Sequence, residues 1–267
     1  MKKQYFPDNS YKTDLSGSPS GFFAWILQSR FIFLLRLLRI VLRSRKLALK
    51  GKYDREEWSR SSIDIMRLLE KSGGEFNISG FDKLRSLDEP VVFVSNHMST
   101  LETFVFPVLI VPFLDATFVV KESLINFPLF GTIMRSVNPI VVSRENSKND
   151  LLLVLNKGSD LIKSGISVIV FPQSTRRPYF KISEFNSLAV KLAKKNNVKL
   201  VPIAIKTDFW KKGRWLTELG PLDRKNKDIL IEFGEPLDDE DSGKQAHRKV
   251  IEFISTKLKL WKVTVIE

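Results

Sequence analysis

The sequence predicts an α/β fold in which a mixed, partly parallel sheet is covered by helices. Three observations indicate this class. Short runs rich in β-branched residues recur along the chain, and stretches with helical periodicity lie between several of them. The third is size, because 267 residues with 43% hydrophobic content can bury a sizeable core.

The elements follow from these local patterns. Helical periodicity over residues 53–71 stops at Gly73-Gly74, because glycine favours the end of a helix. Further helices are expected within 150–163 and 186–196, and near the C-terminus around His247. The expected strands are Val91 to Ser95, Ala116 to Val120, Pro139 to Val142, Ser167 to Phe171, Leu200 to Lys206 and Ile229 to Phe233.

The net charge of +13 is concentrated near the N-terminus, where residues 1–50 alone carry +8. There, large apolar residues of the segment 22–43 alternate with Arg36, Arg39 and Arg43, which helical spacing places on one face. No apolar run approaches the roughly 18–20 residues that cross a bilayer. We therefore expect residues 1–48 to form a polar N-terminus and a basic amphipathic helix at a membrane interface, and residues 49–267 to form the main domain.

In this interpretation the apolar side chains of the helix lie among acyl chains, and its arginines contact anionic headgroups on the cytoplasmic face of a membrane. The side chains expected among the acyl chains are Trp25, Phe31, Phe33 and Leu37. The alternative is a helix that packs on its own domain and exposes a solvated basic face. A nucleic-acid partner is not expected, because the basic residues lie in a strongly apolar segment without a recognition motif.

One of only two histidines follows the first buried run, in the segment Asn96-His97-Met98-Ser99-Thr100-Leu101-Glu102. An imidazole can remove a proton from a hydroxyl near neutral pH, and a nearby carboxylate fixes its tautomer. His97 and Glu102 are therefore candidates for catalysis. Ser99-x-x-Glu102 is also a capping box, and the spacing does not decide between the two roles.

Three further segments follow in an order that resembles the glycerolipid acyltransferase superfamily, which includes the 1-acylglycerol-3-phosphate acyltransferases. Residues 97–102 resemble its H-x4-D motif, and residues 171–176 (Phe-Pro-Gln-Ser-Thr-Arg) resemble F-P-E-G-T-R. Residues 131–144 resemble its glycine-and-arginine block, and residues 201–203 (Val-Pro-Ile) its V-P strand. The resemblance covers about residues 90–206.

The chain departs from the family pattern at three positions. Glu102 stands where the family has Asp, Gln173 where it has Glu, and Ser174 where it has Gly. Glutamate keeps the charge and adds one methylene, so the imidazole contact remains feasible. Gln173 removes a negative charge and Ser174 removes conformational freedom, which leaves room for an acceptor other than 1-acylglycerol-3-phosphate.

The resemblance implies roles for individual residues. It implies that Arg144, Arg176 and Lys121 hold the phosphate of the acyl acceptor, a task for which the planar guanidinium suits arginine. Arg135 and Arg177 carry less weight, since each is also compatible with an ordinary surface charge. The remaining motif positions, expected to shape the site, are Asn96, Gly131, Arg135, Phe171, Pro172, Gln173, Ser174, Thr175 and Pro202.

The implied reaction is acyl transfer from acyl-CoA or an acyl-carrier protein to the hydroxyl of a lysophospholipid, at a membrane. No cofactor or metal is expected, since the chain has no cysteine and two histidines. A serine-hydrolase route lacks a G-x-S-x-G elbow. The alternatives are a lipid A type or other lipid O-acyltransferase and an inactive membrane-surface protein. The apolar segment 104–114 fits either an acyl-chain groove or a buried helix.

Overall fold

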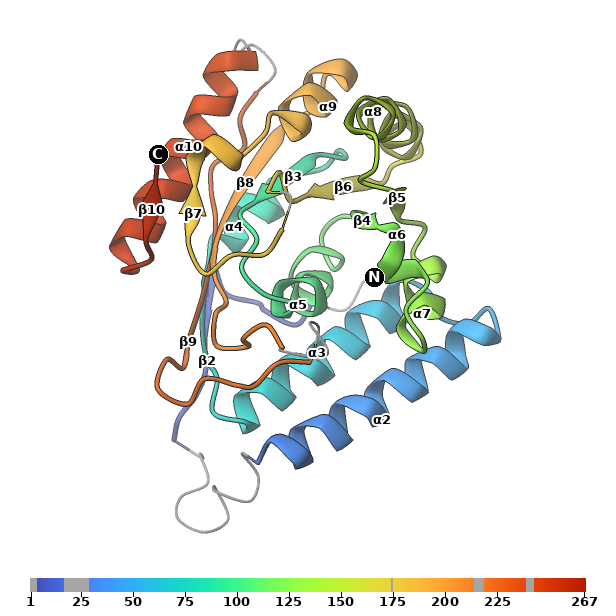
Figure 1. The fold of residues 1–267 in the computed structure, drawn as a ribbon, viewed down its shortest axis with the longest axis vertical. Helices are drawn as coiled ribbons and strands as arrows, with labels where there is room; N and C mark the ends of the chain where they lie inside the picture. Colours follow the sequence, from blue (N-terminus) through green and yellow to red (C-terminus); the bar gives the residue numbers. More distant parts are fainter. Residues whose placement is uncertain (1–3, 17–28, 174, 214–218, 239–242) are drawn as a thin grey trace.

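A computed structural model describes residues 4–16, 29–173, 175–213, 219–238 and 243–267. Its main element is an eight-stranded sheet with the strand order β1-β2-β9-β8-β3-β6-β4-β5 (Figure 1). The pairs β1–β2 and β8–β9 are antiparallel, and the other neighbours are parallel. The strands are β1 (Ser10–Lys12), β2 (Glu75–Ser79), β3 (Val92–Ser95), β4 (Ala116–Lys121), β5 (Ile140–Val142), β6 (Ser167–Val170), β8 (Leu200–Lys206) and β9 (Asp228–Phe233).

Helices cover both faces of this sheet, which confirms the predicted fold class. The helices are α2 (Arg30–Leu49), α3 (Arg55–Lys71), α4 (Phe81–Arg85), α5 (Leu101–Ile110), α6 (Glu122–Ile125), α7 (Phe130–Ser136), α8 (Ser147–Lys163), α9 (Leu188–Asn196) and α10 (Gly243–Leu260), with a 3-10 turn at Ile182–Glu184. A short parallel pair, β7 (Phe180–Lys181) and β10 (Val265–Ile266), lies beside α10.

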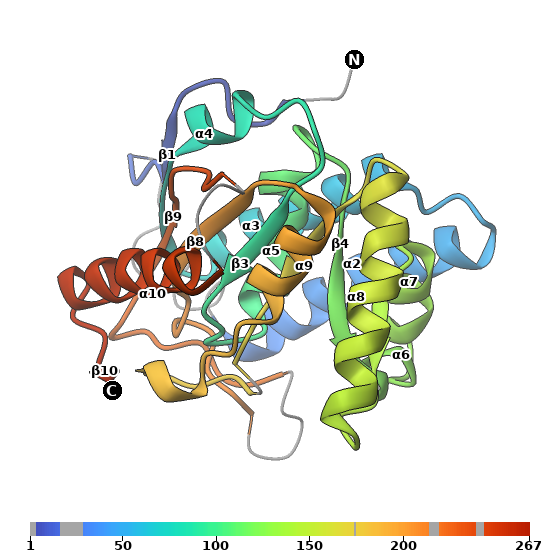
Figure 2. The ribbon, with the colours of Figure 1, turned by 90° about the horizontal axis from the view of Figure 1, so that it is seen from above.

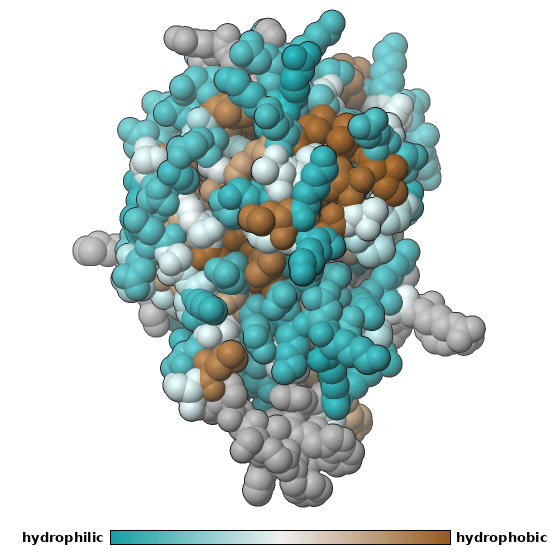
Figure 3. Space-filling view, turned by 90° about the vertical axis from the view of Figure 1, so that its left-hand side faces the viewer, coloured by the Kyte–Doolittle hydropathy of each residue, from teal (hydrophilic) through white to brown (hydrophobic). Residues whose placement is uncertain are grey.

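The alternation of side chains along the strands divides the core into two layers. Phe93 and Ile169 point toward the layer formed with α3 and α5. Their neighbours Val92, Val94 and Val168 point toward the layer formed with α8, α9 and α10. Figure 2 shows these last three helices nearest the viewer. On the face that carries α10, hydrophilic side chains predominate, with apolar patches between them (Figure 3).

The helix boundaries follow from local capping. The Asp54 side chain accepts a hydrogen bond from Glu57 N at 2.9 Å and starts α3, and Asn146 starts α8 in the same manner. Gly73 adopts a φ of +97° just after α3, a conformation that other residues rarely adopt. The segment 104–114, for which two roles were open, is largely buried: the side chains of Phe106, Val108 and Leu109 are fully inaccessible, so this part of α5 is core.

Helix α2 corrects the expectation for the N-terminal segment. Phe33 and Leu37, expected among acyl chains, are buried against the protein itself. The ring of Phe33 meets Trp210 at 5.2 Å, and Trp210 stacks on Phe104 of α5 at 5.6 Å. Figure 1 shows α3 between α2 and α5. Trp25 lies outside the described residues.

A different stripe of α2 is exposed. Phe31 has 71% of its surface accessible. Four exposed leucines follow it at intervals of three, four or seven residues, so they lie on the same face of the helix. Arg43, in contrast, pairs with Asp64 of α3 at 3.0 Å. The exposed apolar stripe consists of Phe31, Leu35, Leu38, Leu42 and Leu49, and is flanked by the exposed Arg39 and Lys46.

The side chain of Asn96 joins the ends of β3 and β8. Its Nδ2 donates to Ile205 O and its Oδ1 accepts from Ile205 N, both at 2.9 Å. The amide thus continues the ladder between β3 and β8 one step beyond Ser95, the last residue of β3. Asn96 is buried, so no solvent replaces these bonds.

We expect Asn96→Ala to lower the free energy of unfolding by about 2–4 kcal/mol, because it leaves two buried backbone groups of Ile205 without partners. Urea denaturation followed by circular dichroism measures the change. The matched control is Asn77→Ala, at an exposed position of β2, which should shift the midpoint little. Equal midpoints for the two variants would contradict the assigned role.

Candidate active site

The carboxyl ends of five parallel strands meet at one edge of the sheet, and the predicted site residues gather there. β3 leads directly to Asn96 and His97, β6 to Phe171, and β4 ends at Lys121. Because β3, β4, β5, β6 and β8 run in the same direction, the loops that follow them share this edge. Such edges are the usual location of sites in α/β folds.

His97 and Glu102 are in direct contact. Nδ1 of His97 lies 2.8 Å from Oε1 of Glu102, whose side chain is completely buried, whereas 14% of the His97 side chain is accessible. An ionised carboxylate only accepts hydrogen bonds, so Nδ1 carries a proton, and in the neutral imidazole the lone pair is therefore on Nε2. This is the tautomer that a general base requires.

Glu102 also reaches back to Ser99, as in the capping box that the sequence left open, although the cap residue of α5 is Thr100, whose side chain makes no cap hydrogen bond. Its Oε1 accepts from the backbone N–H groups of Met98 at 2.8 Å and Ser99 at 2.9 Å. Its Oε2 accepts from Ser99 Oγ at 3.0 Å and from Thr207 Oγ1 at 2.7 Å. The two roles coexist, because one carboxylate has acceptor sites for both.

These donors keep the buried carboxylate charged. Burial alone raises the pKa of Glu102, but the hydrogen bonds from His97, Thr207 and Ser99, and the positive charge that His97 carries when protonated, outweigh it, so the pKa lies below its ordinary value. The negative charge of Glu102 is therefore retained inside the protein, in direct contact with the imidazole of His97.

The backbone of His97 is fixed by the segment that follows β6. His97 N donates to Oε1 of Gln173 at 2.8 Å, and His97 O accepts from Arg177 N at 3.1 Å. The imidazole stacks on Phe171 with the ring centres 4.3 Å apart. Gln173 is buried, and its Nε2 has no hydrogen-bond partner within the described ranges.

Two of the three predicted phosphate ligands, Arg144 and Arg176, follow neighbouring segments at this edge of the sheet. Desolvation lowers the pKa of Arg144, the carboxylate of Asp150 opposes this, and the charge of Arg176 adds a smaller lowering. Arg176 Nη1 donates to Thr100 Oγ1, one residue before α5. A pair of neighbouring guanidiniums is favourable for binding a doubly charged anion.

Strand pairing brings the third basic residue to the same edge. Lys121 is aligned with Val142 in the β4–β5 pair, two residues before Arg144. The backbone of Arg144 has a φ of +63° and is held by Asp150, whose Oδ2 accepts from Arg144 N at 2.8 Å. Lys121 is exposed, so its ammonium is accessible to a ligand.

The other motif positions shape the backbone around these groups. A Cβ on Gly131 would lie 2.0 Å from Ile125 O, so only glycine fits there. Arg135 donates to the same carbonyl at 2.6 Å and therefore belongs to the packing of α6 on α7. Pro172 is buried, Pro202 is aligned with Val94 in the sheet, Thr175 is exposed, and Ser174 lies outside the described residues.

The sequence interpretation did not include Thr207. Its signal was its position directly after the V-P strand, at the same edge as His97. In the described part of the chain no three His, Cys, Asp or Glu side chains are grouped to hold a metal ion.

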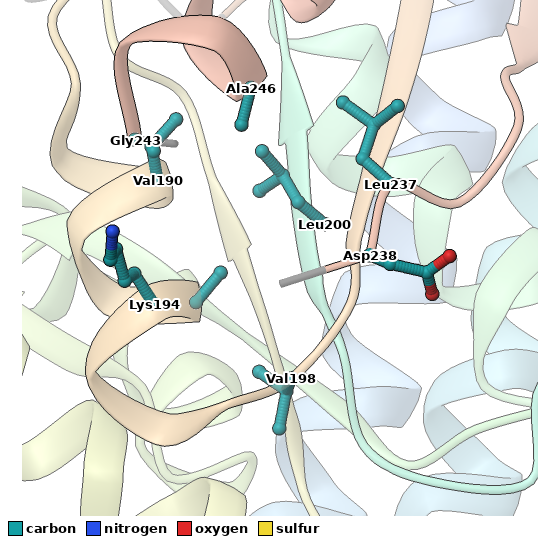
Figure 4. A pocket seen from close by; sticks show the side chains of 9 residues that line it. Val190, Lys194, Val198, Leu200, Leu237, Asp238, Gly243 and Ala246 are labelled. Atoms are coloured by element: carbon teal, nitrogen blue, oxygen red, sulfur yellow. The ribbon is translucent and has the colours of Figure 1, made fainter. Parts of the chain in front are cut away.

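A hollow between α9 and the start of α10 lies elsewhere (Figure 4). Its lining includes Val190, Leu200 and Ala246. Leu200 begins β8 and Thr207 follows its end, about 23 Å away at a rise of about 3.3 Å per residue. The hollow is therefore at the opposite edge of the sheet.

Residues 75–206 match the model of the family described as Acyltransferase. The chain is 28% identical over 168 residues to the 1-acyl-sn-glycerol-3-phosphate acyltransferase of Pseudomonas aeruginosa, covering 62% of this chain and 63% of that protein. It is 25% identical to the enzyme of the same name from Saccharomyces cerevisiae, over 79% of this chain and 77% of the yeast protein.

The crystal structure of the 1-acyl-sn-glycerophosphate (LPA) acyltransferase PlsC from Thermotoga maritima shares the fold. The TM-score is 0.65 at 20% identity, over 90% of this chain and 96% of that one. The family match and the curated relatives identify residues 75–206, about half of the chain, as an acyltransferase region of the glycerolipid acyltransferase superfamily, and the shared fold agrees with this.

Proposed function

We propose that the protein is an O-acyltransferase of phospholipid biosynthesis that transfers a fatty acyl group from acyl-CoA or an acyl-carrier protein to the hydroxyl of 1-acylglycerol-3-phosphate. The observation that supports it most directly is the 2.8 Å contact between His97 and Glu102 at the sheet edge that also carries Arg144 and Arg176. The names of the two curated relatives agree with this substrate.

In the proposed reaction, Nε2 of His97 removes the proton of the acceptor hydroxyl as its oxygen attacks the thioester carbonyl. Glu102 stabilises the imidazolium that forms. The tetrahedral intermediate then collapses, the C–S bond breaks, and the thiolate takes up the proton that His97 holds. The products are the diacyl lipid and the free thiol, and His97 returns to its initial state. Proton transfer contributes on the order of 10²- to 10⁴-fold to the rate.

The phosphate of the acceptor lies between Arg144 and Arg176 in this proposal, with Lys121 beside it. An anion there relieves the repulsion between the two guanidiniums and accepts charge-assisted hydrogen bonds from them. Since Arg176 also contacts Thr100 next to α5, the phosphate is held close to the helix that carries Glu102. The acceptor hydroxyl is thereby positioned relative to His97.

The exposed apolar stripe of α2 is proposed to rest on the cytoplasmic face of a membrane. Five large apolar side chains on one helix face, flanked by Arg39 and Lys46, match the composition of an interfacial helix. Among the described residues, no helix has the length and apolar character needed to cross a bilayer. Both lipid substrate and product would reach the protein from that surface.

We expect His97→Ala to lower kcat by about 10²- to 10⁴-fold, because the general base is lost. Thiol release from oleoyl-CoA, and from an acyl-carrier protein in parallel, is measured in detergent with lysophosphatidic acid, other lysophospholipids and glycerol 3-phosphate as acceptors. His247→Ala, at the second histidine, is the control and should remain active. No acceptor-dependent release by the native protein with either donor would contradict the function.

We expect Arg144→Ala and Arg176→Ala each to raise KM for lysophosphatidic acid about tenfold or more, because each removes a charge-assisted contact to phosphate. KM for a neutral monoacylglycerol, wherever its turnover is measurable, should change less. Lys148→Ala, at an exposed position of α8, is the control. A KM increase of equal size for charged and neutral acceptors would argue against phosphate recognition by these arginines.

We expect the double variant Leu38→Glu/Leu42→Glu to lower the partition of the protein onto anionic phospholipid vesicles at least tenfold, since burial of each leucine contributes about 1.5–3 kcal/mol. Vesicle co-sedimentation measures the partition. The matched control is Leu152→Glu/Leu153→Glu, which changes two exposed leucines of α8. If both double variants bind vesicles like the native protein, α2 is not the docking helix.

A further inference from the structure

Thr207 is the first residue beyond β8, and it is fully buried. Its Oγ1 donates to Oε2 of Glu102 at 2.7 Å, across 105 positions of sequence. Four other hydrogen bonds to this carboxylate come from residues 97–99, which belong to the same turn as the histidine. Thr207 therefore supplies a contact of a different kind, which ties the carboxylate to a neighbouring strand.

This contact decides how the carboxylate is oriented. A glutamate side chain has one more rotatable bond than an aspartate, so its terminal oxygens need additional restraint. The donors in residues 97–99 move with the turn that contains them. Thr207 fixes Oε2 from outside that turn, and Oε1 is then held toward Nδ1 of His97.

The position of Thr207 is itself well fixed. Lys206, the residue before it in the sequence, is buried and donates from Nζ to Asn226 Oδ1 at 2.6 Å. Asp208, on the other side, accepts from Asn226 Nδ2 at 2.6 Å and pairs with Lys206 at 3.3 Å. These three side chains are linked to one another, so both sequence neighbours of Thr207 are held in place.

We infer that Thr207 is a positioning residue for the acyl transfer proposed above: it orients the Glu102 carboxylate toward His97 and stabilises its negative charge. The inference rests on the proposed function for its effect on rate. Its effect on the His97–Glu102 pair is independent of any substrate, because the hydrogen bond exists in the free protein.

The sign of the expected effect follows from charge. Adding a proton to the pair neutralises its negative charge, so a donor that stabilises that charge opposes protonation. Removal of the Thr207 hydroxyl makes protonation easier and moves the titration of the coupled pair to higher pH. Among the described residues, the segments around the pair carry Arg176, which contacts Thr100, Arg177, whose N–H binds His97 O, and Lys206, which is paired with Asp208; all three remain in the variants.

The test compares Thr207→Val, which keeps the shape but removes the donor, with Thr207→Ser, which keeps the donor. We expect Thr207→Val to lower kcat about 10- to 100-fold. In the pH profile of kcat/KM, the midpoint of the acid limb should move to higher pH by about one unit. Thr207→Ser should restore the native limb and most of the rate. A purely structural role would change the amount of folded protein and leave the limb in place.

The second readout is the pH titration of the histidine ring signals in protein labelled with ¹⁵N-histidine. The chain has only two histidines, so both are assigned by substitution. In Thr207→Val the His97 signals should titrate at higher pH than in the native protein and in Thr207→Ser. His247, which stacks on Phe185, should titrate unchanged.

The outcomes separate the two proposals. If the native protein transfers no acyl group, the proposed function is wrong, and the ring titration still decides the role of Thr207. If the native protein is active and His97→Ala is not, but Thr207→Val keeps the native limb and ring titration, the inference about Thr207 is overturned. Should Thr207→Val fail to fold by circular dichroism, Thr207→Ala is titrated in its place.

Discussion

The buried charge of Glu102 is the constraint on which the rest of the site depends. An ionised carboxylate inside a protein is strongly unfavourable unless donors surround it. Here the donors come from the turn after β3, from the histidine and from the end of β8. The turn must therefore have the conformation that aims its N–H groups inward, and β3 and β8 must be neighbours in the sheet. The two hydrogen bonds between Asn96 and Ile205 hold the ends of β3 and β8 together.

A second constraint is the placement of positive charge. Arg144 lies after β5 and Arg176 after β6, and neither arginine has to be close to the other for the sheet to form. The charge of Arg176 contributes to lowering the pKa of Arg144, although desolvation and the opposing carboxylate of Asp150 have larger effects. The positive phi of Arg144 and its backbone contact with Asp150 hold this arrangement before any ligand binds.

Much of the fold could be predicted from sequence because its strands are nearly continuous apolar runs. Leu200–Lys206 has the predicted boundaries, and α3 and α8 end at the predicted residues. The short strands β1, β7 and β10 could not be predicted, since two or three residues carry no periodicity. Strand β2 was also missed, because the polar Asn77 lies at its centre.

The site shows the same division between local and long-range information. Residues 97–102 contain both partners of the histidine contact, so their proximity could be inferred from spacing. Thr207 could not be recognised, because its contact with Glu102 depends on which strands are neighbours. The interpretation of α2 was wrong for Phe33 and Leu37 for a related reason: the helix is apolar on two faces, and only packing shows which face the protein buries.

The aromatic contacts of α2 have a mechanical consequence. Phe33 packs on Trp210, and Trp210 stacks on Phe104, which lies two residues after Glu102. Through these rings the outer helix packs onto the helix that bears the acid. If α2 rests on a membrane as proposed, this packing sets the distance between the membrane surface and the imidazole. That distance in turn determines how far a lipid headgroup must rise from the surface to reach His97.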